Sequence, residues 1–189
     1  MIFQETTATK KIKALKRRIR VIQGGSSASK TISILLYLIA LAQSDKSPTL
    51  TSIVGESIPF LKKGVIRDFK NILQGHKYWK DSNWNATDNI YTFETGSQIE
   101  FFSTDNGDKL RGARRDRCFM NEANNNSFEA FEQLEIRTKE FTIIDYNPTY
   151  QKAVLLLIQN ASAKKNAVVY AKLLVCHLAK RVKILDSVS

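Results

Sequence analysis

A short polar segment between a strand pattern and a helix pattern has the residue types that bind phosphate groups. It reads Gly24-Gly25-Ser26-Ser27-Ala28-Ser29-Lys30-Thr31 and matches the pattern G-x-x-x-x-G-K-[ST] except at Ser29, which stands in the second glycine position. Small residues let backbone N–H groups surround phosphates, and the following helix adds its positive N-terminal end. Lys30 would reach the β- and γ-phosphates of ATP, and Thr31 would bind Mg²⁺. A side chain at Ser29 restricts a turn that glycine makes easily, and a generic Ser-rich turn is the alternative.

A second polar pair follows the apolar run Cys118-Phe119-Met120 and consists of Asn121 and Glu122. In many ATPases with a phosphate-binding loop (P-loop) this pair is Asp-Glu: the Asp holds Mg²⁺ through its water shell, and the Glu activates the attacking water. Asn121 can accept a hydrogen bond from metal-bound water, but it adds no negative charge. Glu122 is therefore the candidate catalytic base. The alternative is that Glu122 only begins the next helix, where an acid is favoured anyway.

The segments that must position these residues alternate between strand and helix patterns. Strands are predicted at 18–23, 50–55, 117–120 and 141–145, and helices at 30–43, 59–73 and 128–137. Two further strand patterns, 89–94 and 98–103, flank Thr95-Gly96-Ser97 and predict a hairpin. The alternation predicts an α/β fold with a mostly parallel P-loop NTPase-type sheet, flanking helices and a β-hairpin insertion. The tail from 150 to 189 could form helix, but it lacks residues that would mark boundaries.

Composition narrows the class of protein. The 189 residues suit one domain, or one domain with an appendage, and the net charge is +11. Basic residues concentrate at 10–20 and in the tail, where they form either a solvated face or a contact for a phosphate backbone. Two cysteines and two histidines exclude a disulfide framework and a structural zinc site. Cys118 is expected to be a buried thiol, and neither a membrane segment nor a secretory signal is expected.

Four segments together resemble the ATPase domain of the phage terminase large subunit, the motor that packages double-stranded DNA into proheads. They are GGSSASKT at 24–31, GSQIEFFSTDNGDKLRG at 96–112, FMNEAN at 119–124 and IIDYNPT at 143–149. The resemblance covers about residues 15–149, and the hairpin followed by LRG and NEAN is more specific than the P-loop. It implies an ATPase that uses ATP and Mg²⁺ and couples hydrolysis to translocation of DNA.

The resemblance also implies roles for single residues and for partners. Arg111 of the LRG triplet matches an arginine finger that acts on the γ-phosphate of a neighbouring subunit. Arg114, Arg115 and Arg117 are nearby alternatives, and plain surface charge is another. Asp145 and Asn147 match the coupling motif that senses the γ-phosphate, although strand-end turn chemistry would also explain them. The implied partners are double-stranded DNA, a portal protein, a small terminase subunit and further copies in a ring, in the cytoplasm of a bacterial host.

One departure from the family concerns its C-terminal nuclease domain, which cuts DNA with clustered carboxylates and metal ions. Here 40 residues follow Thr149, and Asp186 is their one acid, so a two-metal nuclease is not expected. We expect an ATPase domain at 1–149 and a basic tail at 150–189, from a truncated or frame-shifted gene. A non-catalytic P-loop fragment that binds nucleotide or DNA without turnover is the alternative. A helicase is a third possibility, disfavoured by the LRG–NEAN arrangement.

Overall fold

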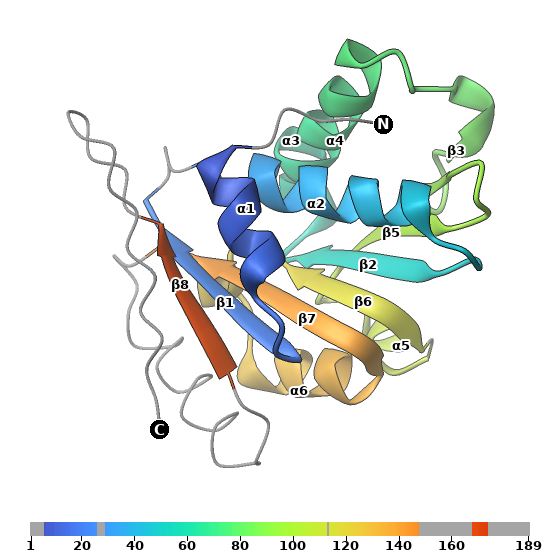
Figure 1. Ribbon diagram of the computed structural model, residues 1–189. Coiled ribbons are helices and arrows are strands. Elements are labelled where there is room, and N and C mark those ends of the chain that lie inside the picture. The colour runs from blue at the N-terminus through green and yellow to red at the C-terminus, as the bar shows by residue number, and fades with distance from the viewer. Residues whose placement is uncertain (1–5, 26–28, 113, 148–167, 174–189) are drawn as a thin grey trace.

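An eight-stranded sheet runs through the computed structural model, which describes residues 6–25, 29–112, 114–147 and 168–173 (Figure 1). Its strand order is β3-β4-β5-β2-β6-β7-β1-β8. The strands are β1 (Ile19–Gly24), β2 (Leu50–Gly55), β3 (Trp84–Asn85), β4 (Ile90–Thr92), β5 (Gln98–Ser103), β6 (Arg115–Met120), β7 (Thr138–Tyr146) and β8 (Val168–Leu173). The helices are α1 (Thr7–Ala14), α2 (Lys30–Ser44), α3 (Ile58–Lys63), α4 (Val65–Gly75), α5 (Gly107–Arg111) and α6 (Phe128–Ile136). The predicted α/β class is confirmed.

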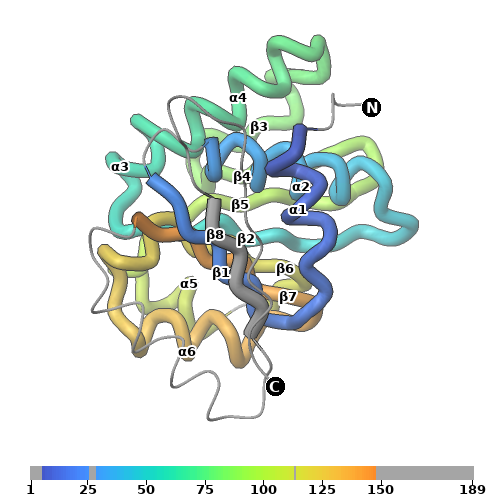
Figure 2. The backbone as a smooth tube through the Cα atoms, turned by 60° about the vertical axis from the view of Figure 1, so that its left-hand side comes forward, coloured from blue at the N-terminus to red at the C-terminus, as the bar shows by residue number. Residues whose placement is uncertain are grey.

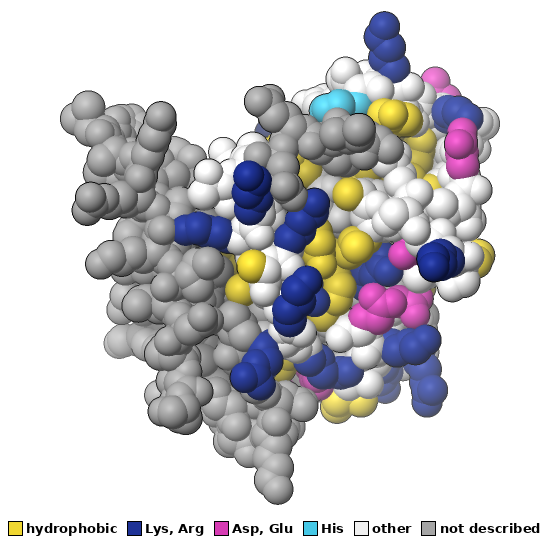
Figure 3. Space-filling model, viewed as in Figure 1, with side chains coloured by type: hydrophobic (Ala, Val, Ile, Leu, Met, Phe, Trp, Pro, Cys, Tyr) yellow, Lys and Arg dark blue, Asp and Glu magenta, His cyan; other side chains and the backbone are white. Residues whose placement is uncertain are grey.

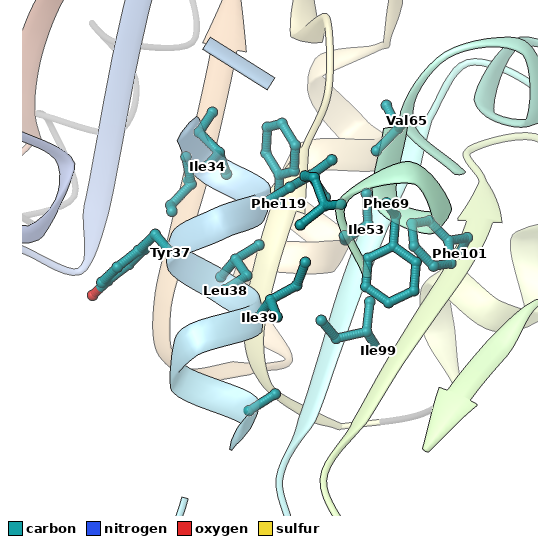
Figure 4. Close-up of a cluster of buried hydrophobic side chains, with 14 of the residues drawn as sticks. Ile34, Tyr37, Leu38, Ile39, Ile53, Val65, Phe69, Ile99, Phe101 and Phe119 are labelled. Carbon is teal, nitrogen blue, oxygen red and sulfur yellow. The ribbon is translucent and has the colours of Figure 1, made fainter. Parts of the chain in front are cut away.

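Helices cover both faces of this sheet. Helices α1 to α4 lie on one face, and α5 and α6 lie on the other (Figures 1 and 2). Between the sheet and α2 and α4, apolar side chains form the larger core cluster, which Figure 4 shows with Leu38 of α2, Phe69 of α4 and Phe119 of β6. A smaller cluster under α6 includes Phe131, and it also contains Cys118, whose thiol is buried as expected. None of the helices in the described part of the chain has the length and apolar character needed to cross a bilayer.

The hairpin around Gly96 is confirmed, and it is joined directly to the main sheet. Its first strand, β4, pairs antiparallel with β5, while β5 pairs parallel with β2. Gly96 has φ 79°, a left-handed conformation that favours glycine. From β5 through β2, β6, β7 and β1 to β8, every described pair of neighbouring strands is parallel. The carboxyl ends of these strands therefore meet at one edge, where ligands bind in open α/β sheets.

Three segments differ from the sequence prediction or were left open by it. The helical pattern at 59–73 forms two helices, α3 and α4, because the chain turns at Gly64, with φ −113° and ψ −97°. The basic N-terminal segment forms α1, which buries Ile12 and packs on α2. In the tail, where helix was considered, residues Val168–Leu173 form a strand that pairs parallel with β1.

An ion cluster around the buried Arg117 lies at the opposite edge of the sheet, near the amino ends of the parallel strands. The Arg117 guanidinium donates to Asp45 at 2.7 Å and to Glu140 at 2.8 Å, and only 6% of the Arg117 side chain is exposed. Burial alone would raise the pKa of Asp45, but hydrogen bonds from Arg117 and Thr49 and the charge of Arg117 hold it below its ordinary value. The cluster fastens the end of α2 to β6 and β7.

Candidate nucleotide-binding site

The P-loop pattern lies where the sequence predicted it, between the end of β1 and the start of α2. Ser26, Ser27 and Ala28 lie outside the described residues. Lys30 is the first residue of α2, and 8% of its surface is exposed. Its ammonium donates hydrogen bonds to the carbonyl oxygens of Gly24 at 2.7 Å and Gly25 at 3.0 Å. The loop therefore keeps a positive charge at the carboxyl edge of the sheet. Thr31, half-buried, is the next residue of the helix.

Ser29, in the second glycine position of the pattern, has a backbone conformation that glycine adopts without strain. Its φ of 49° and ψ of 26° lie in the left-handed region, and its side chain makes no capping hydrogen bond to α2. This conformation costs an L-residue about 1–2 kcal/mol, a cost that glycine does not bear. The restriction expected from the sequence is therefore present, and the turn forms despite it.

Glu122 follows β6 at the same edge and also has a left-handed backbone. Its φ is 48° and its ψ is 57°, so the chain turns sharply after the strand. Its half-buried side chain accepts a hydrogen bond from Asn125 Nδ2 at 3.3 Å. A short 3₁₀ turn, Ala123–Asn125, follows, and α6 begins only at Phe128. Strain in a non-glycine residue at such a place is a common property of functional loops.

Asn126 braces this turn, a role that was not predicted from the sequence. Its Nδ2 donates to the carbonyl oxygen of Glu122 at 3.2 Å, and its Oδ1 accepts from the hydroxyl of Thr104 at 2.7 Å. Thr104 directly follows β5, so the brace joins the ends of two strands. The run of three asparagines at 124–126 was the only local signal for it.

Asp145 lies on β7, between β6, which leads to Asn121, and β1, which leads to the P-loop pattern. The pairs Met120↔Ile144 and Ile22↔Asp145 fix this register, because β7 lies between β6 and β1. Asp145 Oδ1 accepts hydrogen bonds from Asn121 Nδ2 at 3.1 Å and from the backbone N–H of Glu122 at 2.8 Å. Both Asn121 and Asp145 are buried, with 3% and 1% of their surfaces exposed. The predicted metal-site and coupling residues thus touch each other.

The protonation equilibrium of Asp145 reflects this burial. Loss of contact with water raises the pKa of its carboxyl from 3.8 to about 6. The hydrogen bonds from Glu122 and Asn121 and the positive charge of Lys30 act in the other direction, while the carboxylate of Glu122 adds to the rise. Asp145 therefore shares an electrostatic environment with the predicted P-loop lysine and the predicted base.

The candidate arginine finger lies outside this group. Arg111 ends α5, its side chain is 69% exposed, and its guanidinium lies 3.9 Å from Glu129 on α6. Of its alternatives, Arg115 and Arg117 are buried, with 2% and 5% of their surfaces exposed, so they are not free to reach another subunit. Arg114 is exposed. Asn147, half-buried, follows directly after β7 at the carboxyl edge.

A magnesium site of the P-loop type fits these residues. Among the described residues, no three His, Cys, Asp or Glu side chains gather as they would in an all-protein metal cage. Mg²⁺ bound with ATP is instead held mostly by phosphate oxygens and water, with one or two side chains from the protein. The hydroxyl of Thr31 at the helix start and the buried carboxylate of Asp145 would supply oxygens of this kind.

Comparison with solved structures finds the same fold in large terminases. The large terminase of a thermophilic bacteriophage matches with a TM-score of 0.68 and 18% identity over 82% of this chain. The chain spans 40% of the length of that protein. The same thermophilic phage terminase in complex with ATP-γ-S matches with a TM-score of 0.64 and 16% identity, covering 83% of this chain and 39% of that one.

Two further solved structures extend the likeness. The HK97 bacteriophage large terminase matches with a TM-score of 0.61 and 13% identity, over 93% of this chain and 38% of its own. The Phi-28 gp11 DNA packaging motor has a TM-score of 0.53 and 10% identity, over 91% of this chain and 60% of its own. Comparison with curated proteins gives no match.

The family itself is shown by sequence. The model of the phage terminase large subunit family, Terminase_3, matches residues 16–176. The match extends beyond the resemblance seen at 15–149 and includes β8, the strand found in the tail. Because the match covers most of the sequence, this chain belongs to the phage terminase large subunit family.

Proposed function

We propose that this chain is the ATP-hydrolysing domain of a viral DNA-packaging motor. The observation that carries the proposal is the meeting of Lys30, Glu122 and Asp145 at the carboxyl edge of the parallel part of the sheet. Family membership supports it, as do the structures of the thermophilic phage terminase with ADP and with ATP-γ-S, which have the same fold.

The residues of the loop would bind the phosphates of ATP, and those of the turn at Asn121 and Glu122 would act on the metal and the attacking water. Backbone N–H groups of residues 24–31 and the ammonium of Lys30 bind the phosphates, which compete for Lys30 with the carbonyl oxygens of Gly24 and Gly25. Thr31 and Asn121 would hold Mg²⁺, Thr31 through its hydroxyl and Asn121 through a metal-bound water. Bound Mg²⁺ would neutralise charge on the β- and γ-phosphates. Glu122 accepts a proton from the attacking water, and its fixed backbone keeps the carboxylate in place.

Assembly would complete the site. Arg111 is exposed on α5, as a finger that reaches a neighbouring subunit must be. A ring of copies would therefore hydrolyse ATP faster than a single chain, because each finger stabilises charge on the next subunit's nucleotide. We propose that Asn147, one residue beyond β7, passes the loss of the γ-phosphate to movement of the chain.

Charge supports double-stranded DNA as the substrate that is moved. The net charge is +11, and Figure 3 shows Lys and Arg side chains gathered over α1 on one face. Lys10 and Lys13 on α1, and Lys16 and Arg17 just after it, are exposed. Such a face suits a phosphate backbone, and binding through it would weaken as salt rises. A portal protein, a small terminase subunit and the cytoplasm of a bacterial host complete the proposed setting.

The test is phosphate release from ATP with and without double-stranded DNA. Wild type and Glu122→Gln are compared, with Glu56→Gln as a matched control, since Glu56 is an exposed acid that follows β2 at the same edge. We expect the Glu122 variant to lose turnover while it still binds nucleotide, and the control to keep both. Nucleotide binding without turnover in wild type, even at concentrations that allow assembly, would instead favour the non-catalytic fragment.

A further inference from the structure

The metal side of the proposed ATPase site lacks the charge that this chemistry normally uses. Asn121 stands where an aspartate would hold the water shell of Mg²⁺, and its amide is neutral. A buried carboxylate nevertheless lies one strand away, at the end of β7. Because β7 lies between β6 and the P-loop strand β1, this carboxylate is one strand closer to the P-loop than Asn121 is.

The contact between Asn121 and Asp145 shows how a carboxylate at 145 goes together with an amide at 121. Asp145 in its ionised form only accepts hydrogen bonds, so the amide group of Asn121 must turn its Nδ2 towards it, as it does at 3.1 Å. An aspartate at 121 would instead place two carboxylates in contact in a buried site, which repels strongly. Asn121 is thus the residue that tolerates a carboxylate at 145.

Asp145 is surrounded by residues of the proposed ATPase site. The charge of Lys30 stabilises its ionised form, and Glu122, the proposed base, donates its backbone N–H to it. Among the described residues both hydrogen-bond donors use Oδ1. In this part of the chain Oδ2 accepts no hydrogen bond, so it is the oxygen left to accept one from the water shell of a cation.

We propose that Asp145 supplies the carboxylate that positions the water shell of Mg²⁺ bound with ATP, a role moved from β6 to the neighbouring strand β7. The inference rests on the ATPase function proposed above and deepens its site. Asp145 would then act from β7, between Asn121 and the P-loop, and this role is separate from its proposed role in coupling.

A purely structural role for Asp145 is the competing explanation. In that case its carboxylate only holds Asn121 and the Glu122 turn in place through Oδ1. An asparagine at 145 keeps an Oδ1 acceptor for both donors but removes the charge. The variant Asp145→Asn therefore removes the negative charge and keeps the acceptor that holds Asn121 and the Glu122 turn. The double variant Asn121→Asp/Asp145→Asn restores one carboxylate, at the end of the neighbouring strand β6.

The experiment measures how much Mg²⁺ strengthens binding of ATP-γ-S in the full chain. Dissociation constants are determined by calorimetry with Mg²⁺ and with EDTA for wild type, Asp145→Asn and the exchanged double variant. We expect the strengthening by Mg²⁺ to fall by about 10- to 100-fold in Asp145→Asn, as when an outer-shell metal partner is lost. The double variant should recover it. Mn²⁺ in place of Mg²⁺, followed by electron paramagnetic resonance, gives a second readout independent of turnover.

Each result has a distinct meaning. Strengthening by Mg²⁺ that is unchanged in Asp145→Asn overturns the inference and leaves the ATPase proposal standing. Equal loss in the single and the double variant, with both folded by circular dichroism, also overturns it, because charge would not be the cause. A wild type that binds no nucleotide in either buffer overturns the ATPase proposal itself, and the inference with it.

Discussion

Replacing Asp145 with asparagine should make the metal-free protein more stable. Burial raises the pKa of this carboxyl from 3.8 to about 6, so at neutral pH the fold holds a carboxylate in a place that favours its protonated form. A rise of this size costs the folded state about 3 kcal/mol once the group is ionised. Asparagine keeps the Oδ1 acceptor without the charge, and we expect it to recover most of that free energy.

The pH dependence gives the prediction its sign. Below pH 3.8 the carboxyl is protonated in both the folded and the unfolded chain, so wild type and variant differ little. As the pH rises, the unfolded chain ionises first and the folded chain only near pH 6, so the wild type loses stability relative to the variant. The advantage of Asp145→Asn should grow from about 1 kcal/mol at pH 4.5 to about 3 kcal/mol at pH 7.5.

Urea unfolding in EDTA buffer at these two pH values measures the effect. For a domain of this size the midpoint at pH 7.5 should rise by roughly 1–1.5 M. Asp88→Asn is the control, because Asp88 is exposed, and it should change stability by less than about 0.5 kcal/mol. A variant that is no more stable than wild type at pH 7.5, or whose advantage does not depend on pH, would refute the reasoning.

Three further predictions concern the loop, the ion cluster and α5. Ser29→Gly should raise the free energy of unfolding by up to about 1 kcal/mol because it relieves a φ of 49°, and Ser29→Val should lower it; an opposite order in urea unfolding would contradict this. Asp45→Ala should cost about 3 kcal/mol at pH 7 because it leaves Arg117 buried beside one partner, and Glu140→Ala, with 40% of its side chain exposed, less than about 1 kcal/mol. The low pKa of Asp45 means that this cost shrinks as the pH falls below 3.8; equal losses in the two variants at pH 7 would count against the assignment. Gly112→Ala places a Cβ 2.8 Å from a carbonyl oxygen of the preceding turn, so thermal unfolding should show a loss of about 1–2 kcal/mol, and an unchanged midpoint would show that the turn adapts.

Much of the fold could be predicted because its signals are local. The strand at 50–55 is a β-rich run bounded by polar residues, and the structure has the same bounds. The hairpin follows from Gly96 between two alternating segments. Helix α1 was left open because its lysines obscure a short apolar face that includes Ile12. Strand β8 has no glycine or proline near it to mark its ends.

The sequence predicted single residues of the site, but not the contacts between them. Lys30 and Glu122 stand out through their neighbours in sequence, and the structure places both at the carboxyl edge. The contact of Asn121 with Asp145 depends on which strands lie side by side, and no local pattern contains the strand order. The same holds for Arg117, whose main partner Asp45 lies 72 positions away in the sequence.

The position of β1 within the sheet has a consequence for how the chain folds as it is synthesised. The strand is made early, yet its neighbours are β7 and β8, and Ile19 pairs with Thr142 and Val168. At about 5–20 residues per second, the ribosome needs roughly 6–25 seconds to add the first of these partners. During that time the backbone N–H and C=O groups of β1 lack their partners in β7 and β8. Parallel pairing between strands so far apart in sequence is slow. The strand that leads into the P-loop pattern is thus made early but gains its neighbouring strands only late in synthesis.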